Sequence, residues 1–279
     1  MTSIELNIVV AHSIEAKPLL KLLRMKKCTT STTFPLYKND QGECLIVSGM
    51  GKIAAAAATA YLAARQENEK NNVRAWLNIG IAGHQNAELG SGVLAQKLTD
   101  YATGRSFYPP MSISGINTSD VITVDKPELE YPLNAAYEME ATGFYSSASR
   151  FVTSELVQVF KIISDNPRNH VHNVNLDMIP EWISSQEENI LMILGKLKAL
   201  VNDYNRIYQL PDEYHQLSAK CRFSATQIVQ LKKVCQRYIA LGLQKDLQSR
   251  VLSSCTTAKL IITGLESGLA DQLLTGTQK

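Results

Sequence analysis

The pattern of hydrophobic and polar positions divides the chain into two parts. Up to about residue 170, short runs rich in Val and Ile alternate with longer segments of helical periodicity. Several of the short runs are almost continuously apolar, which is typical of strands in a sheet that is covered on both faces. We therefore predict strands at residues 4–11, 43–49, 75–80, 93–100 and 156–164.

Two longer segments between these strands have the pattern of helices. They are residues 15–27, EAKPLLKLLRMKK, and residues 52–70, KIAAAAATAYLAARQENEK. The second is rich in alanine, the residue with the highest helix propensity. Strands that alternate with helices predict an α/β domain built around a largely parallel sheet.

Beyond about residue 176 the apolar residues recur at steps of three and four, the period of amphipathic helices. Residues 180–210, 224–252 and 256–274 show this pattern. Ser224 followed by Gln227 has the spacing of a capping box, a helix start in which each side chain binds the other's backbone. We predict three or four helices that form a C-terminal helical region over residues 173–279.

Composition narrows the class of protein. The chain has 279 residues, 45% of them hydrophobic, which is enough for a large core. Its net charge of +2 is too small to indicate nucleic-acid binding, and no apolar run approaches the roughly 20 residues of a membrane span. The first residues lack the basic start and the cleavage site of a secretory signal. We therefore expect no nucleic-acid partner, no membrane partner and a cytoplasmic location.

Cysteine and histidine give no indication of a metal site. The five cysteines are scattered without metal-ligand spacing, as expected for reduced thiols in the cytoplasm. His170 and His172 are two residues apart, and their polar surroundings favour a solvated loop over a metal site. We expect no metal and no organic cofactor.

Two glycine-rich turns follow predicted strands. Gly49 and Gly51 precede the alanine-rich helix, and Gly80 and Gly83 lie at the end of the strand predicted at residues 75–80. Glycine permits positive φ and a close approach of backbone to a ligand, and a following helix presents free N–H groups. Each turn alone could be a tight strand-to-helix connection, and neither matches a Walker loop or the full dinucleotide fingerprint. Together they indicate a ligand cleft at the strand ends.

Five segments occur in the order found in one enzyme superfamily. They are NIVVAHSIEAKPLLKLL, LIVSGMGKIAAAAATAYL, LNIGIAGHQNAELGSGVLAQKLTDY, YEMEATGFYSSASRF and VFKIISDN, which together cover roughly residues 5–170. On these motifs the chain resembles the nucleoside phosphorylase and nucleosidase superfamily (purine and uridine phosphorylase family 1), and its pattern is most similar to that of methylthioadenosine/S-adenosylhomocysteine nucleosidase. The resemblance implies a three-layer α/β fold over residues 1–172, with a central mixed, largely parallel β-sheet flanked by helices. It does not account for the helical region.

The resemblance implies a purine nucleosidase that cleaves the N-ribosidic bond of an adenine nucleoside, such as methylthioadenosine, S-adenosylhomocysteine or 5′-deoxyadenosine. Because the departing base gains electrons, a carboxyl group beside its N7 can act as a general acid. The family's acid corresponds to Asp165, with Ser164 orienting it. A strand that ends in Ser-Asp is also often only a helix cap or a loop anchor.

Further substrate-binding residues follow from the same resemblance. Glu140 would hold the ribose 2′- and 3′-hydroxyls, and Met139 would lie against the ribose. Glu138 belongs either to the site or to a salt bridge. The remaining residues expected to contact the substrate, along the base and in the central glycine turn, are Ile122, Thr123, Gly80, Ala82 and Gly83.

The nucleophile is predicted to be water. Phosphorylases of the superfamily bind phosphate with an arginine ahead of the first glycine of the central turn and a serine or threonine just after it. Here these places hold Asn78 and Ile81, and no local arginine can bind phosphate in their stead. The alternative is a phosphorylase with an atypical phosphate site, completed by a neighbouring subunit.

The nucleosidase branch positions its water with a glutamate near the end of the first strand. An ungapped alignment places Ala16 there, with Glu15 one residue earlier. A shift of one residue would make Glu15 the catalytic base, and His12 or Ser13 could replace it. A third alternative is a nucleoside-binding or scaffolding protein without turnover. We also expect a homo-oligomer, as is common in the superfamily.

Overall fold

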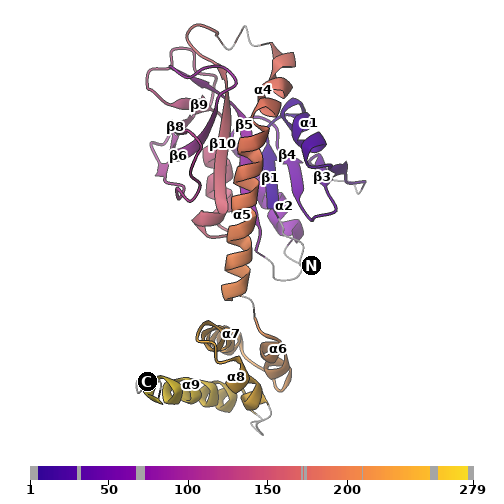
Figure 1. The fold of residues 1–279 in the computed structure, drawn as a ribbon, viewed down its shortest axis with the longest axis vertical. Coiled ribbons are helices and arrows are strands. Elements are labelled where there is room, and N and C mark those ends of the chain that lie inside the picture. The colour runs from indigo at the N-terminus through magenta and orange to yellow at the C-terminus, as the bar shows by residue number, and fades with distance from the viewer. Residues whose placement is uncertain are drawn as a thin grey trace. The chain divides into compact units, whose positions relative to one another are not determined.

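The computed structural model describes residues 6–29, 33–66, 73–170, 172, 175–208, 210–251 and 257–275. The chain forms two compact units (Figure 1). We call them the α/β unit, Met1–Asn202, and the helical unit, Asp203–Lys279. Among the described residues, no helix has both the length and the apolar character needed to cross a membrane.

The α/β unit is built on one mixed sheet. Its described strands are β1 (Leu6–Val10), β2 (Lys26–Lys27), β3 (Leu36–Lys38), β4 (Cys44–Val47), β5 (Ala75–His84), β6 (Gly92–Asp100), β7 (Ser106–Phe107), β8 (Thr118–Thr123), β9 (Ala136–Glu138) and β10 (Val157–Asp165). They follow the order β10-β6-β8-β9-β5-β1-β4-β3-β2, with β7 beside β6. Parallel pairings join β4, β1, β5 and β10, and also β6, β8 and β9. Because β10 pairs with β5 as well as with β6, the strands β10, β6, β8, β9 and β5 close into a ring.

The predicted strands are confirmed as β1, β4, β5, β6 and β10. Every residue of β1 and of β10 is buried, which is why these segments carry almost continuous apolar runs. The sequence did not reveal the other strands. β2 and β7 are two residues long, too short for an alternating pattern, and β8 begins with the polar residues Thr118, Ser119 and Asp120.

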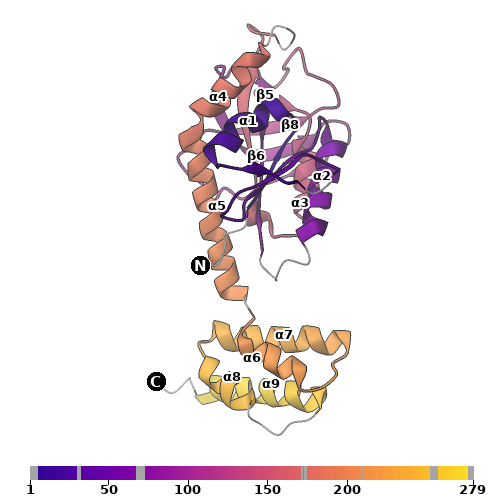
Figure 2. The same cartoon turned by 90° about the vertical axis from the view of Figure 1, so that its right-hand side faces the viewer.

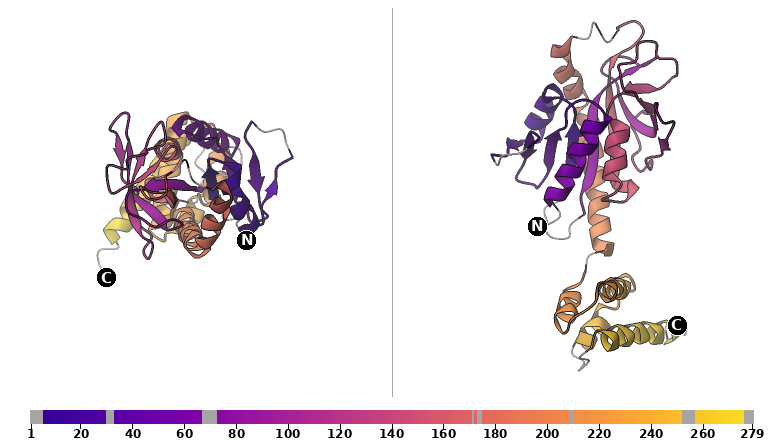
Figure 3. Two further views of the ribbon diagram at one scale, coloured as in Figure 1. Left: turned by 90° about the horizontal axis from the view of Figure 1, so that it is seen from above. Right: turned by 180° about the vertical axis from the view of Figure 1, so that it is seen from behind.

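Helices cover both faces of the sheet. α2 (Lys52–Gln66) and α3 (Ala141–Ala148) lie side by side on one face, and α1 (Ser13–Leu22) and α4 (Ile179–Ser185) lie on the other (Figures 2 and 3). α2 and α3 come close because Gly143 has no side chain, and a Cβ there would overlap the Lys52 carbonyl. Two 3-10 turns within the described residues are η1 (Ser154–Leu156) and η3 (Leu176–Met178).

The first helix is shorter than predicted. α1 ends at Leu22, and Arg24 adopts a φ of +50°, a left-handed conformation that ends a helix and redirects the chain. Lys26 and Lys27 then form β2 and pair with β3 instead of continuing the helix. α2 ends at Gln66, and the predicted residues 67–70 lie outside the described residues.

The α/β unit extends beyond the boundary expected after residue 172. α4 packs against α1 and β10, and α5 (Glu187–Tyr208) follows it along the unit. Lys198 of α5 forms an ion pair of 2.5 Å with Glu43, which directly precedes β4. These contacts explain why the division between the two units falls within α5, after Asn202.

The helical unit has its own apolar core. Its helices are α6 (Asp212–Ala219), α7 (Ala225–Ala240), α8 (Gln244–Val251) and α9 (Ala258–Thr275). Leu231, Cys235 and Tyr238 of α7 contribute to this core, and the Tyr238 hydroxyl donates a hydrogen bond of 2.9 Å to the Leu265 carbonyl of α9. Each helix therefore buries one face within the unit.

The capping box predicted at the start of α7 is confirmed. Ser224 and Gln227 each bind the backbone of the other. The number of helices was underestimated, since the described residues beyond 178 form α4 to α9. A break at Gln186 separates α4 from α5, and Gly242, with a φ of +70°, separates α7 from α8. The apolar period continues across both breaks, so the sequence pattern alone merged the helices.

Candidate active site

The strand register places several predicted site residues in one row. Ile122 of β8 is opposite Tyr137 of β9, Tyr137 is opposite Gly83 of β5, and Gly83 is opposite Asp165 of β10. Gly83 and Asp165 lie at the carboxyl ends of the parallel strands β5 and β10, where ligands bind in many α/β folds, and β9 runs antiparallel beside β5. The fold therefore brings Ile122, Gly83 and Asp165 together from distant parts of the sequence.

Asp165 is a buried carboxylate with both oxygens occupied. The Ser164 hydroxyl donates to Asp165 Oδ1 at 2.5 Å, and it also lies 3.4 Å from the Ala82 carbonyl. The Tyr131 hydroxyl donates to Asp165 Oδ2. Only 5% of Asp165 is exposed, so these hydrogen bonds take the place of water around the carboxylate. Ser164 thus fixes the orientation of the Asp165 side chain.

Tyr131, the hydrogen-bond donor to Asp165 Oδ2, was not indicated by the sequence. It lies in the loop between β8 and β9, is fully buried, and belongs to an apolar cluster with Ile122, Tyr137 and Met139. Its ring and that of Tyr137 meet edge to face, with centroids 6.0 Å apart. Burial raises the pKa of Tyr131, and the Asp165 carboxylate raises it further, so the hydroxyl stays protonated and acts as a donor.

Gly83 makes room for this pair. A Cβ at Gly83 would overlap both Asp165 Oδ2 and the Tyr131 ring. The glycine is therefore required by close packing, although its φ is not positive, in contrast to Gly49 and Gly51. The Tyr131 ring occupies the space that a side chain at position 83 would fill.

A second polar group surrounds Lys161, in the middle of β10. Its Nζ lies 2.9 Å from Glu138 Oε2, and the two side chains are 1% and 0% exposed. Gly80 is opposite Lys161 in the strand register. A Cβ at Gly80 would lie 3.1 Å from Glu15 Oε1 and 3.3 Å from Lys161 Nζ, so Gly80 marks the place where these two charged groups meet.

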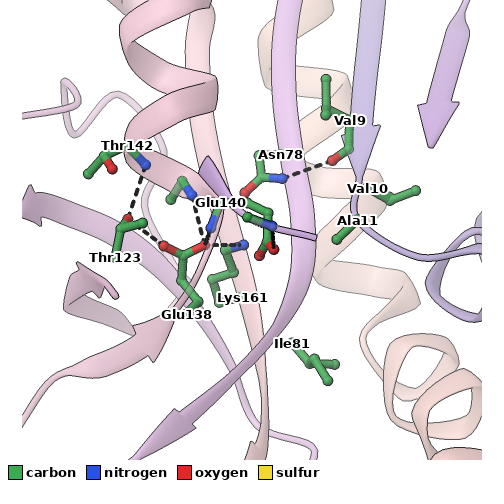
Figure 4. A network of polar contacts seen from close by, with 12 residues as sticks. Val9, Val10, Ala11, Asn78, Ile81, Thr123, Glu138, Glu140, Thr142 and Lys161 are labelled. Atoms are coloured by element: carbon green, nitrogen blue, oxygen red, sulfur yellow. Dashed lines mark hydrogen bonds and ion pairs between the residues drawn. The ribbon is translucent and has the colours of Figure 1, made fainter. Parts of the chain in front are cut away.

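Glu138 anchors the start of α3. Its Oε2 accepts hydrogen bonds of 2.8 Å from the backbone N–H groups of Glu140 and Ala141, where a helix start favours negative charge. The Thr123 hydroxyl donates to Glu138 Oε1 at 2.5 Å and accepts from the Thr142 N–H at 3.1 Å. Figure 4 shows this chain of contacts from Thr142 through Thr123 and Glu138 to Lys161. Glu138 is thus a salt-bridge partner, and Thr123 binds Glu138.

Glu140 connects the glycine turn at Gly49 and Gly51 to the polar cluster around Lys161. Its Oε1 accepts a hydrogen bond of 2.7 Å from the Gly51 N–H, which the positive φ of Gly49 and Gly51 helps to direct. Burial raises the pKa of Glu140; Lys161 opposes this shift, whereas Glu138 adds to it. Met139, between the two glutamates, packs against the apolar cluster around Tyr131.

Glu15, rather than Ala16, points toward Lys161. Glu15 Oε2 accepts from the N–H groups of Ala11 and His12 at 2.9 and 2.8 Å, and Oε1 accepts from the Ile81 N–H at 3.1 Å. Burial raises the pKa of Glu15, even though these bonds and Lys161 oppose the shift. Ala16 is buried in the core, whereas His12 and Ser13 are exposed.

Lys161 could have been found from the sequence. A lysine within the apolar strand VQVFKIISD has to be buried, and a buried ammonium requires carboxylate partners. Tyr131 carries no comparable signal, because it lies 34 residues from Asp165 in a loop. Only the tertiary structure brings them together.

Asn78 lies two residues before Gly80 on β5. Its Nδ2 donates to the Val9 carbonyl at 3.0 Å (Figure 4). Its Oδ1 is buried and has no hydrogen-bond partner in the described part of the chain. A buried acceptor of this kind is suited to bind a water molecule or a polar ligand group.

A cavity of about 420 Å³ has His84, the residue after Gly83, in its lining. It is lined by His84, Ala87, Ser91, Val93, Gln96, Asn117, Thr118, Ser119, Asp120 and Asn134, and by none of the predicted site residues. The chemistry of the row points to Asp165, so we place the candidate site there and not in this cavity. Within the described residues, no cluster of His, Cys, Asp and Glu could hold a metal ion.

Comparison with known proteins identifies the fold. No protein-family model matches the chain, and no curated protein sequence matches it. Among solved structures, the methylthioadenosine/S-adenosylhomocysteine nucleosidase of Colwellia psychrerythraea in complex with adenine matches with a TM-score of 0.56 at 22% identity. The match covers 70% of this chain and 96% of that one.

Two further solved structures have the same fold. The methylthioadenosine/S-adenosylhomocysteine nucleosidase of S. pneumoniae with a transition-state inhibitor has a TM-score of 0.52 at 23% identity, over 70% of this chain and 99% of that one. A futalosine hydrolase mutant of Helicobacter pylori has a TM-score of 0.53 at 12% identity, over 68% of this chain and 99% of that one. The α/β unit therefore has the fold of these two nucleosidases and of the futalosine hydrolase, as its ordered motifs predicted.

Proposed function

We propose that the chain is a purine nucleosidase that hydrolyses the N-ribosidic bond of an adenine nucleoside. The observation that carries this proposal is the position of Asp165. It is a buried carboxylate oriented by Ser164, in the same strand row as Ile122 and Gly83. The fold is that of nucleosidases, and one of these structures holds adenine. A buried, oriented carboxyl group is suited to give a proton to a departing base.

The two clusters of polar residues have separate roles in the reaction: the one around Asp165 acts on the base, and the one around Lys161 acts on the water and the sugar. The bond from ribose C1′ to the base N9 breaks, and its electron pair goes to the base while Asp165, which enters this step in its protonated form, gives its proton to N7. A water oxygen forms the new bond to C1′ and gives its proton to Glu15. Glu140 accepts hydrogen bonds from the ribose hydroxyls, and the carboxylates stabilise the positive charge on the sugar. Lys161 offsets part of their mutual repulsion.

Several contacts favour water over phosphate as nucleophile. The Ile81 N–H already donates to Glu15, and the Ile81 side chain has no donor for a phosphate oxygen. Lys161 is ion-paired with Glu138, and three carboxylates near it would repel an anion. Asn78 Oδ1, which has no hydrogen-bond partner among the described residues, is an acceptor, which suits water and disfavours phosphate.

For the substrate, we favour a 5′-modified adenosine such as methylthioadenosine, S-adenosylhomocysteine or 5′-deoxyadenosine. The support is the set of structural neighbours, among them methylthioadenosine/S-adenosylhomocysteine nucleosidases. A cytoplasmic location and a homo-oligomer stay predictions of the sequence. The helical unit has no part in this proposal.

The test is base release by the full chain in phosphate-free buffer. Methylthioadenosine, S-adenosylhomocysteine, 5′-deoxyadenosine, adenosine and inosine are incubated separately, and free base is measured by chromatography. We expect release of adenine, and a loss of about 10²–10⁴-fold in kcat for Asp165→Asn. Release that requires phosphate and yields a sugar 1-phosphate would make the chain a phosphorylase. No base release from any of these nucleosides would overturn the proposal.

One observation favours a second candidate, a nucleoside-binding protein without turnover. The Tyr131 hydroxyl occupies Asp165 Oδ2, the oxygen that would have to reach the base. Calorimetry separates the two candidates: adenine nucleosides would bind with no cleavage during long incubation. Cleavage by wild type that Asp165→Asn abolishes would exclude this candidate.

A further inference from the structure

We propose that Tyr131 is an internal occupant of the nucleobase subsite, and that residues 125–135 must move before a base can reach Asp165. This inference rests on the proposed function, because it assigns the subsite to a purine. We call residues 125–135, which connect β8 to β9, the strap. The geometry of the Tyr131 side chain carries the argument.

The ring of Tyr131 lies where the base is expected. A base bound at Asp165 would have to lie over Gly83, the residue opposite Asp165 in the register. The Tyr131 ring already fills this space, since a Cβ at Gly83 would overlap it. The ring packs with Ile122 and Met139, which are the residues predicted to contact the base and the ribose. A flat aromatic ring thus takes the contacts that a purine ring would make.

The hydroxyl of Tyr131 takes the remaining hydrogen-bonding position of the acid. Ser164 holds Asp165 Oδ1, so Oδ2 is the oxygen available to a base nitrogen. Tyr131 donates to Oδ2. A purine and Tyr131 therefore cannot bind Asp165 at the same time.

The backbone at Tyr131 is strained. Its φ is +46°, in the left-handed region that a bulky side chain adopts only at a cost in free energy. Pro132 follows, and proline favours an extended backbone at the residue before it, which the φ of Tyr131 departs from. The inserted side chain holds this conformation, and its withdrawal would allow the backbone to relax.

The rest of the strap is held weakly. Leu129, Pro132 and Leu133 are exposed, and Leu129 and Leu133 are 41% and 59% accessible despite being apolar. The Leu133 N–H donates to the Tyr137 hydroxyl at 2.9 Å, and Asp125 forms an ion pair of 3.0 Å with Lys52 at the surface. Tyr131 is thus the large buried side chain of the strap, whereas the other buried residue, Ala135, is small and directly precedes β9. A segment with one large buried side chain can open without disrupting the core.

The experiment compares the full-length wild type with Tyr131→Ala and Tyr131→Phe, using adenine as the probe in calorimetry. We expect Tyr131→Ala to bind adenine at least tenfold more tightly than wild type, because no side chain has to be displaced. Tyr131→Phe keeps the ring but loses the hydroxyl, so we expect an intermediate affinity. Leu129→Ala, an exposed change in the same strap, is the matched control and should bind as wild type does. Thermal unfolding establishes that each variant is folded.

Hydrogen exchange in wild type gives a second measurement that needs no variant. Saturating adenine should increase exchange of the strap amides, while amides of β6 serve as an unaffected reference. Equal or weaker adenine binding by Tyr131→Ala would overturn the inference and indicate that Tyr131 is a binding contact. Unchanged strap exchange at saturation, or no adenine binding by wild type and both variants, would also overturn it.

The failure of the proposed function is distinguishable from these results. Tighter adenine binding by Tyr131→Ala without base release from any nucleoside supports the inference and overturns the hydrolase proposal. If wild type releases base and Tyr131→Ala does not change the affinity for adenine, the hydrolase proposal is supported and the inference about Tyr131 is overturned.

Discussion

Lys161 Nζ lies 2.9 Å from Glu138 Oε2, and both side chains are almost completely removed from solvent. Glu140 and Glu15 also act on this ammonium. Burial alone would lower the pKa of Lys161, but the negative charges of Glu138, Glu140 and Glu15 outweigh it and raise the pKa. One cation thus faces three carboxyl groups, and the group as a whole determines which of them carry protons.

Replacing Lys161 with Met should lower the free energy of unfolding by about 3–5 kcal/mol, because Glu138 would be left as an unpaired buried charge. Chemical denaturation of the full chain measures the loss. The double variant Lys161→Met/Glu138→Gln removes both charges and should recover part of it. If Lys161→Met is as stable as wild type, the ion pair does not contribute to the fold.

The pH dependence should follow the raised pKa of Glu15. Burial moves this pKa above its ordinary value of 4.5, so the proposed base becomes ionised only at higher pH. We expect the acidic limb of kcat/KM to lie above 4.5. A kcat/KM profile across this range measures the limb, and Glu15→Gln should lose activity at every pH.

Stability provides an independent measurement of the same shift. The folded state binds the Glu15 proton more tightly than the unfolded state, so this stabilisation is complete below 4.5 and is lost as pH rises through the folded pKa. Denaturation midpoints measured over this range should fall more steeply in wild type than in Glu15→Gln. Identical slopes would show that Glu15 is not shifted. Glu140, whose pKa burial also raises, acts in the same direction and is common to both proteins.

The sequence indicated Asp165, the proposed acid, but not Tyr131, which donates a hydrogen bond to it. Asp165, Glu140 and Glu15 belong to short sequence motifs. The order of these motifs along the chain predicted the fold, and it is visible in the sequence alone. The contact of Tyr131 with Asp165 depends on a loop conformation that closes over the row, and no local pattern encodes it. The role of Glu138 was ambiguous for a similar reason, since its partner Lys161 lies on another strand. Which strands are buried could be predicted from their apolar runs. Which polar side chains pair with each other depended on how the strands and loops are placed in the fold.

Gly83→Ala should destabilise the α/β unit by about 1–3 kcal/mol, because the new methyl group would overlap Asp165 and the Tyr131 ring. Denaturation of the full chain measures this change. Gly195→Ala is the matched control: Gly195 lies within α5, and a Cβ there meets no atom within 4 Å. Alanine at this helical position should raise stability by up to about 1 kcal/mol. Equal effects of the two substitutions would contradict the close packing at Gly83.

The capping box of α7 allows the two units to be followed separately. The Gln227 N–H donates to Ser224 Oγ at 3.3 Å, and the Ser224 N–H donates to Gln227 Oε1 at 2.9 Å. Ser224→Ala removes the first bond and should destabilise the helical unit by about 1 kcal/mol. Ser249→Ala is the control: that hydroxyl donates to the Asp246 carbonyl within α8, and its loss should have little effect.

The two tryptophans allow unfolding of the α/β unit to be measured separately by fluorescence. Trp76 and Trp182 both lie in the α/β unit, so their fluorescence follows that unit, whereas far-ultraviolet circular dichroism follows helices of both. Because each unit has its own core, Ser224→Ala should shift part of the dichroism transition and leave the fluorescence transition in place. An equal shift of both signals would mean that the units unfold together, and the division after Asn202 would then not be a boundary of cooperative folding.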